Sequence, residues 1–141
     1  MTAKEFLRGI RGHNQRIKAL MERRQYYYDI AQGTGSGEPP RIGGGNQSSR
    51  VENAVHKLME LEEDLNKEID RLVDEVRLAE RLIDKLEDSR HRDVLKFRYL
   101  NGWSWEKIVS EMNYEKSWVL RLHGEALVRF SKEWYTKYGI I

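Results

Sequence analysis

The chain has 141 residues, two prolines and no cysteine, and its hydrophobic content is 39% against 34% charged residues. This composition is typical of long solvated helices, so we expect an all-α protein, and the lack of cysteine excludes disulfides and thiolate metal sites. No stretch approaches the roughly 20 apolar residues that a bilayer span needs, and the first residues lack the apolar run of a signal peptide. We therefore expect a cytoplasmic protein that does not bind membranes.

Charge divides the chain into blocks. Residues 1–50 carry 9 Lys/Arg and 4 Asp/Glu (+5), residues 51–87 carry 6 and 12 (−6), and residues 88–141 carry 10 and 7 (+3). This division indicates separate roles better than the net charge of +2 does. We predict four segments: an N-terminal helix over 1–31, a flexible Gly-rich loop over 32–48, a long coiled-coil helix over 49–88 and a C-terminal domain over 89–141.

The first predicted helix begins at a capping box, because the Thr2 hydroxyl can accept from the N–H of Glu5 while the Glu5 carboxylate reaches back. Residues that alternate by four and three positions then form a heptad seam, which is typical of a helix packed on another helix. The seam is Phe6, Ile10, His13, Ile17, Leu20, Arg24 and Tyr27.

Most of the chain's glycines and both prolines fall between Gln32 and Ser48, so this segment cannot continue a helix. Its glycines are not followed by Gly-Lys-Ser/Thr and no strand precedes them, so we do not expect a nucleotide site there.

The second predicted helix begins with another capping box, Ser49 and Glu52, and carries a coiled-coil pattern of period 3.5 that only Glu62 interrupts. We hypothesise that Glu62 selects a register or a partner, since a buried charge at a core position is costly and discriminating. The seam is Val51, Val55, Leu58, Leu65, Ile69, Leu72, Val76, Ala79, Ile83 and Leu86.

Two partners could cover this seam: the first helix of the same chain, folded back antiparallel, or a second copy. The opposite charges of the first two blocks favour contact between them, and a loop of about 17 residues imposes only a modest closure entropy. Because the second helix is the longer one, we expect both an antiparallel helical hairpin within the chain and a homo-oligomer through residues 49–88.

After Leu86 the apolar period changes, and a short helix with Val94, Leu95, Phe97, Tyr99 and Leu100 ends at Asn101-Gly102. Trp103 is expected in the core. Ser104 is a suitable N-cap for a next helix, whose inner face is Ile108, Val109 and Met112.

Asn113 then stands where a helix-turn-helix needs a residue that tolerates positive φ. We expect Tyr114 to plug this turn. A third helix would bury Val119, Leu122, Ala126 and Leu127, so the segment predicts a three-helix helix-turn-helix module.

The segment RDVLKFRYLNGWSWEKIVSEMNYEKSWVLRLHGEAL resembles region 4 of bacterial sigma factors. The resemblance rests on Arg98, Tyr99, Gly102, Ser104, Ile108, Val119, Arg121, Leu122 and His123, and it departs at Val109 and at the turn residue Asn113. Together with the predicted hairpin, the chain resembles the phage-encoded RinA- or ArpU-type regulators of late-gene transcription. The resemblance implies DNA binding in the host cytoplasm, on the nucleoid.

If the third helix enters a major groove, its exposed N-terminal face supplies the base contacts. We predict base contacts from Lys116, Ser117 and Arg121, with Leu120 and Gly124 on the same face. Trp118 could stack on sugar, although packing on the first helix of the module is the more ordinary use. The candidates for phosphate contacts are Arg90, Arg92, Lys107, Arg129 and Lys132.

The remaining residues of the sequence show no pattern typical of a metal site or of catalysis. The four histidines lie on separate predicted helices without a second ligand at i+4, so no metal site is expected, and no nucleophile, base and oxyanion group converge. We therefore expect neither an enzyme nor a cofactor. The aromatic residues Tyr26 to Tyr28 and Trp134, Tyr135 and Tyr138 are expected to close one end of a bundle rather than to stack on bases.

The leading hypothesis is a sequence-specific regulator that binds double-stranded DNA through residues 89–131. One alternative is a phage small terminase subunit, which would recognise packaging-site DNA as a ring. A second alternative is an adaptor whose module contacts host RNA polymerase rather than DNA.

Overall fold

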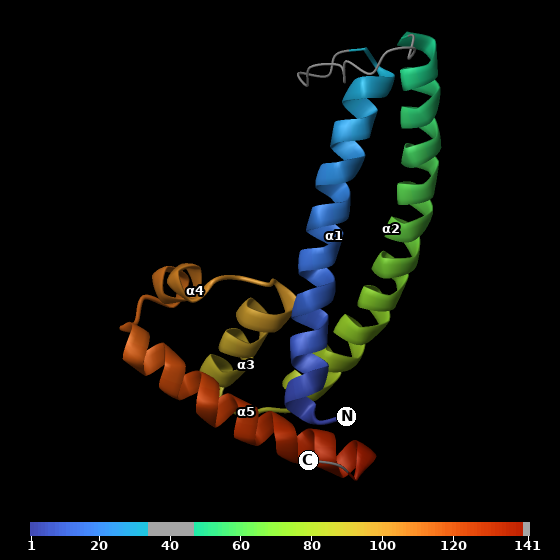
Figure 1. The fold of residues 1–141 in the computed structure, drawn as a ribbon. Helices are drawn as coiled ribbons and strands as arrows, with labels where there is room; N and C mark the ends of the chain where they lie inside the picture. Colours follow the sequence, from blue (N-terminus) through green and yellow to red (C-terminus); the bar gives the residue numbers. More distant parts are fainter. Residues whose placement is uncertain (34–46, 140–141) are drawn as a thin grey trace. The chain divides into compact units, whose positions relative to one another are not determined.

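A computed structural model describes residues 1–33 and 47–139 of the chain (Figure 1). Within these ranges the regular structure is helical throughout, so the predicted all-α class is confirmed, and no helix is long and apolar enough to cross a membrane. The elements are α1 (Ala3–Ala31), α2 (Gln47–Ile83), α3 (Ser89–Leu95), the π-helical turn η1 (Lys96–Leu100), α4 (Trp105–Met112) and α5 (Lys116–Tyr138). Residues 34–46 of the predicted Gly-rich loop lie outside the described residues.

The chain forms two compact units. We call Met1–Gln15 together with Arg71–Ile141 the main unit, and Arg16–Asp70 the two-helix unit. Both α1 and α2 contribute residues to each of them.

In the two-helix unit, α1 and α2 run antiparallel. Arg16 Nη1 lies 3.5 Å from Glu68 Oε1 and Arg24 Nη1 lies 3.4 Å from Glu62 Oε1, so partners on α2 fall in number as those on α1 rise. Between the helices the buried side chains are Ile17, Ala54, Leu61 and Leu65.

The seam predicted for α1 is confirmed, because each of its seven positions is buried or half-buried. The seam predicted for α2 is wrong at two of its ten positions, and the charge said to interrupt it does not lie in a buried seam. Val55 and Ile69 are 42% and 40% exposed, and Glu62 is exposed. Ala54 and Leu61 are buried in place of Val55 and Glu62, so Glu62 is not a buried charge on the seam.

The error has a physical cause. Val55, Glu62 and Ile69 belong to a second stripe of α2, about 100° around the helix from the buried one, and a 3.5-residue period fits either stripe. Contact with α1 decides which of them is buried.

The ends of the first two helices differ in how well they were predicted. The Thr2 and Glu5 capping box is confirmed, with reciprocal hydrogen bonds of 3.0 and 3.1 Å. The Ser49 cap is wrong, because α2 begins at Gln47 and Ser49 lies inside the helix. α2 ends at Ile83, and Leu86 is buried just beyond it.

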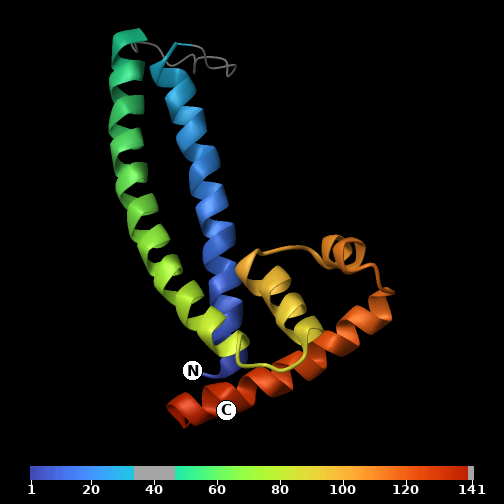
Figure 2. The ribbon, with the colours of Figure 1, turned by 180° about the vertical axis from the view of Figure 1, so that it is seen from behind.

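The main unit has a single core, to which every element contributes. α3 and α4 both pack on α5 and lie on the same side of it in both views (Figures 1 and 2). The N-terminal turns of α1 join this core, where the Phe6 and Trp134 ring centroids are 4.7 Å apart. The buried core residues are Ala3, Phe6, Leu7, Ile10, Ala79, Leu82, Ile83, Leu86, Val94, Leu95, Tyr99, Ile108, Val119, Ala126, Phe130 and Trp134.

The aromatic residues of the two predicted clusters do not behave alike. Trp134 is buried, as expected of a residue that closes a bundle, whereas Tyr135 is 52% exposed. Tyr26, Tyr28 and Tyr138 are exposed as well.

The end of η1 is fixed from both sides. The Asn101 N–H donates to Lys96 O, five residues earlier, as the π-helical turn requires. Gly102 then adopts φ 71°, a conformation that suits glycine, and the helix ends there as predicted. The Asn14 side-chain amide donates to Leu100 O at 2.8 Å, so α1 satisfies a terminal carbonyl of η1.

Candidate nucleic-acid interface

The segment from α4 to α5 follows the local chemistry that its sequence predicts. Ser104 caps α4, with its hydroxyl accepting from the Lys107 N–H at 3.2 Å, and Asn113 ends α4 in the left-handed conformation at φ 58°. Ile108 is fully buried. The prediction that Tyr114 plugs the turn is wrong, because Tyr114 is 39% exposed; Val109 and Met112 pack on the core from this end of α4.

A polar pair inside the main unit connects η1 to α5. The Tyr99 hydroxyl lies 2.7 Å from His123 Nε2, and the Trp105 ring meets the imidazole edge to face at 4.8 Å. Burial, together with nearby cations such as Arg98, lowers the pKa of His123 to about 4. The imidazole is therefore neutral at pH 7, so Nε2 can accept the hydrogen bond that Tyr99 donates.

Arg98 serves the same framework. Its guanidinium carbon lies 4.4 Å from the centre of the Trp105 ring, and Nη1 donates to Trp103 O at 3.0 Å. Trp103, expected in the core, is half-buried and stacks on Phe97 with 4.6 Å between centroids. Arg98 thus holds the loop between η1 and α4 rather than pointing into solvent.

The exposed face of α5 is the one from which DNA contacts were predicted. At 100° per residue its members fall within an arc of about 140° over the first turns of the helix, which places them on one side. They are Lys116, Ser117, Leu120, Arg121 and Gly124, and all five are exposed. Val119 and Leu122, on the opposite side, are fully buried.

Two guanidinium groups flank Trp118 at the edge of this face. The indole is half-buried, and the guanidinium carbons of Arg90 and Arg121 lie 5.9 and 5.4 Å from its centre. Arg90 also pairs with Asp88, with Nη2 2.9 Å from Oδ2. This hydrogen bond holds the pKa of the Asp88 carboxyl well below its usual range and raises the pKa of Arg90.

Glu125, one turn further along α5, forms an ion pair with Arg121. The Arg121 Nε lies 3.4 Å from Glu125 Oε1, while the other carboxylate oxygen lies 3.2 Å from Nε2 of the buried His91. The hydrogen bond from His91, aided by Arg121, lowers the pKa of Glu125. An ionised Glu125 therefore orients Arg121 and also offsets part of its charge.

The remaining cations do not gather on this face. Arg92 Nη1 donates to Leu86 O and Glu87 O, so it closes the linker after α2. Lys107 Nζ lies 4.3 Å from the centre of the Trp103 ring.

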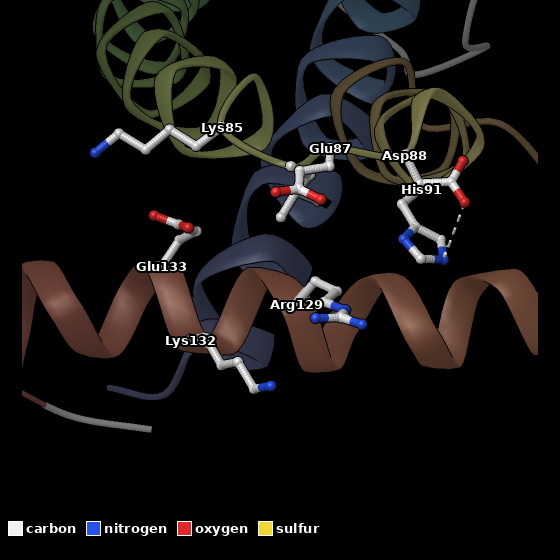
Figure 3. Close-up of a pocket in the computed structure, with 8 residues that line it drawn as sticks. Lys85, Glu87, Asp88, His91, Arg129, Lys132 and Glu133 are labelled. Carbon is white, nitrogen blue, oxygen red and sulfur yellow. Dashed lines mark ion pairs between the residues drawn. The ribbon is translucent and has the colours of Figure 1, made fainter.

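Arg129 and Lys132 line a separate hollow of about 300 Å³ (Figure 3). Acidic groups share this hollow, so its charge is mixed and it is a poor cradle for phosphate. Its other lining residues are Lys85, Leu86, Glu87, Asp88, His91 and Glu133.

The predicted site residues therefore separate into two sets. The face of α5, Trp118 and Arg90 come together, and the other four cations do not join them. Tyr114 was missed: it is exposed at the start of this face and close enough to Arg90 to contribute to its raised pKa. Its place between the turn residue and α5 was the available signal. Within residues 1–33 and 47–139, no group of three His, Asp or Glu side chains could hold a metal ion.

Comparison with known proteins gives a family without a known role. A family model described as "Protein of unknown function (DUF722)" matches residues 13–126, which include α2, α3, α4 and the first half of α5. No curated protein and no solved structure matches the chain.

Proposed function

The chain belongs to the DUF722 family, and we propose that it is a sequence-specific DNA-binding transcriptional regulator of a phage or prophage, acting on late genes. In this proposal α3 to α5 form a helix-turn-helix module like sigma-factor region 4, and α1 and α2 form an antiparallel coiled-coil hairpin. The observation that carries it is the exposed, basic face at the N-terminal end of α5, directly after a left-handed turn residue.

Chemistry supports a base-reading role for this face. When a helix-turn-helix module docks in a major groove, the N-terminal side chains of its recognition helix, here α5, reach the base edges. Arg121 offers the bidentate donor geometry that suits guanine, and Lys116 and Ser117 can reach neighbouring bases or phosphates. Leu120 is 42% exposed and can contact a thymine methyl group.

Gly124 adds a second argument. Glycine inside a helix costs about 1 kcal/mol relative to alanine. A Cβ atom added at Gly124 would meet nothing within 4 Å, so the packing of the described chain does not require glycine there. On an exposed face, the missing side chain leaves room for a nucleic-acid backbone to approach.

Self-association completes the proposal. Val55, Met59, Ile69 and Val73 remain exposed on α2 after it has packed on α1. Apolar residues repeated on one helix face favour a partner helix, and a second copy of the chain is the partner we propose.

The test is binding to DNA fragments of the phage or prophage genome that encodes the chain, followed by substitutions on α5. We expect retention of a discrete fragment, and Lys116→Ala and Arg121→Ala each to weaken specific binding by about 1–3 kcal/mol. The matched control is Lys67→Ala on the exposed side of α2, which should bind as the wild type does.

Other outcomes would assign another role. Recovery of packaging-initiation DNA by a large ring would identify a terminase subunit. If no fragment is retained but RNA polymerase binds, and Lys116→Ala with Arg121→Ala leaves that binding intact, the module is a polymerase adaptor.

A further inference from the structure

The exposed face of α5 changes character beyond Gly124. Val128 and Tyr135 are 58% and 52% exposed, and with Leu127 they line an open groove of about 710 Å³ that reaches α1. The charged residues of this groove are Lys4 and Lys132. A basic-rimmed apolar groove suits a protein partner better than it suits a phosphate backbone.

A helix face of complementary character lies on α2. Val55, Met59 and Ile69, all in the two-helix unit, are between 40% and 66% exposed, and at 100° per residue they fall within an arc of about 80°. We call these three residues the α2 stripe. Their spacing provides the i, i+4 anchors with which an amphipathic helix binds a groove.

Acidic residues border the α2 stripe. Glu52 and Asp70 are exposed along one edge, and Glu62, which is 51% exposed at its side chain, lies on the same face between Met59 and Ile69. The stripe is therefore apolar and acidic, whereas the groove is apolar and basic.

We propose that the groove on α5 of one copy binds the α2 stripe of a second copy. If two grooves paired, Lys4 and Lys132 of one copy would face the same basic residues of the other. If two stripes paired, their acidic edges would likewise face each other. Pairing groove with stripe brings opposite charges together over two apolar surfaces. The inference rests on the self-association proposed above and not on DNA binding.

Such a contact is head-to-tail. Each copy in a bound pair still offers one unused groove or stripe, so the assembly grows until it closes as a ring or continues as an open chain. A two-fold dimer would instead use the same surface twice. Because Val128 follows Gly124 on the face of α5, the neighbouring copy would lie beside the DNA.

Light scattering on the full chain without DNA tests the proposal. Val128→Asp in the groove and Met59→Glu in the stripe should each lower the association constant at least tenfold. An equal mixture of the two variants should recover a two-chain species, because one supplies an intact stripe and the other an intact groove. Leu120→Asp, at the DNA-reading end of the same helix, is the matched control and should associate as the wild type does.

Three results would overturn the inference: a wild-type chain that stays monomeric, a Val128→Asp variant that associates normally, or a mixture that recovers nothing. Both substituted residues are more than half exposed, so each variant should keep the helical content of the wild type, as far-UV circular dichroism measures. If either variant is unstable, the charge pair provides a second test: Lys132→Glu should weaken association, and mixing it with Asp70→Lys should restore it. Loss of DNA binding with association intact would contradict only the proposed function.

Discussion

The two compact units cover their apolar surface to different extents. Among the largest fully buried side chains of the described residues, all but Leu65 lie in the main unit. The two-helix unit buries four apolar side chains between α1 and α2 and leaves Met21, Tyr28, Met59 and others exposed. A pair of helices can bury only one stripe of each, whereas α5 is covered by α3, α4 and the start of α1.

This difference indicates what each unit requires from outside. The main unit encloses its core, although Val128 and Tyr135 of α5 stay exposed outside it. The two-helix unit keeps Val55, Met59 and Ile69 in solvent, which is why we propose a second copy of the chain as the partner of α2.

The largest expected effect is the loss of stability when a core side chain of one unit is truncated. Phe130→Ala removes a fully buried ring from the main unit and should cost about 3–5 kcal/mol of its free energy of unfolding. Leu65→Ala should cost about 2–4 kcal/mol, and we expect that loss to be confined to the two-helix unit. Denaturant titration with hydrogen exchange measures both.

The expected confinement of the Leu65→Ala effect to the two-helix unit would be wrong if this variant reduced amide protection in α5 as much as Phe130→Ala does. Leu127→Ala, on a half-buried side chain of the same helix, controls for the simple removal of a large residue and should cost clearly less.

The features best predicted from the sequence are those that depend on a single residue and its immediate neighbours. Ser104 as a cap and Asn113 in the left-handed region follow from the chemistry of single residues, and both are confirmed. The α1 seam was also predictable, because α1 has one dominant apolar stripe. On α2 the partner chose between two stripes, and no property of Val55 or Leu61 alone reveals that choice.

A middle-sized effect concerns the polar pair inside the main unit. His123 has a pKa of about 4 when folded against an ordinary value of 6.5, so between these values the unfolded chain takes up a proton that the folded chain does not. Stability is therefore lost as the pH falls from 6.5 toward 4, by about 2–3 kcal/mol after allowance for partial exposure.

His123→Gln isolates this contribution, because glutamine offers Tyr99 an acceptor and does not titrate. The variant should lose less stability than the wild type between pH 6.5 and 4.5, as measured by urea titration. That window lies above the range in which Asp88 and Glu125, whose pKa values are lowered, lose their contribution. His56→Gln, at an exposed position, is the control; equal pH dependence in all three proteins would contradict the assignment.

The candidate site was only partly predictable, for a related reason. The resemblance to sigma region 4 includes Tyr99, Leu122 and His123, which pack inside the main unit, so it concerns the framework more than the exposed face of α5. Exposure of Lys116 and Arg121 followed from helix periodicity. The engagement of Arg92 with linker carbonyls did not, since it depends on tertiary contacts.

The smallest effect tests the register of α2. Glu62 pairs with Arg24 at 3.4 Å on the surface, and such exposed pairs contribute at most about 1 kcal/mol, so Glu62→Leu should leave the melting temperature nearly unchanged. Leu61→Glu, one residue earlier, puts a carboxylate into a position that is 8% exposed and should destabilise the two-helix unit markedly.

The same variant also bears on assembly. Because Glu62 supplies part of the negative charge that faces Lys4 and Lys132 of the groove in the proposed contact, Glu62→Leu should weaken self-association by at most about fivefold, which corresponds to about 1 kcal/mol. Had the seam run through Glu62, the substitution would have stabilised the single chain strongly and Leu61→Glu would have been harmless. The pair of variants therefore distinguishes the two registers by opposite signs, and light scattering on Glu62→Leu shows whether the exposed stripe is where a second copy binds.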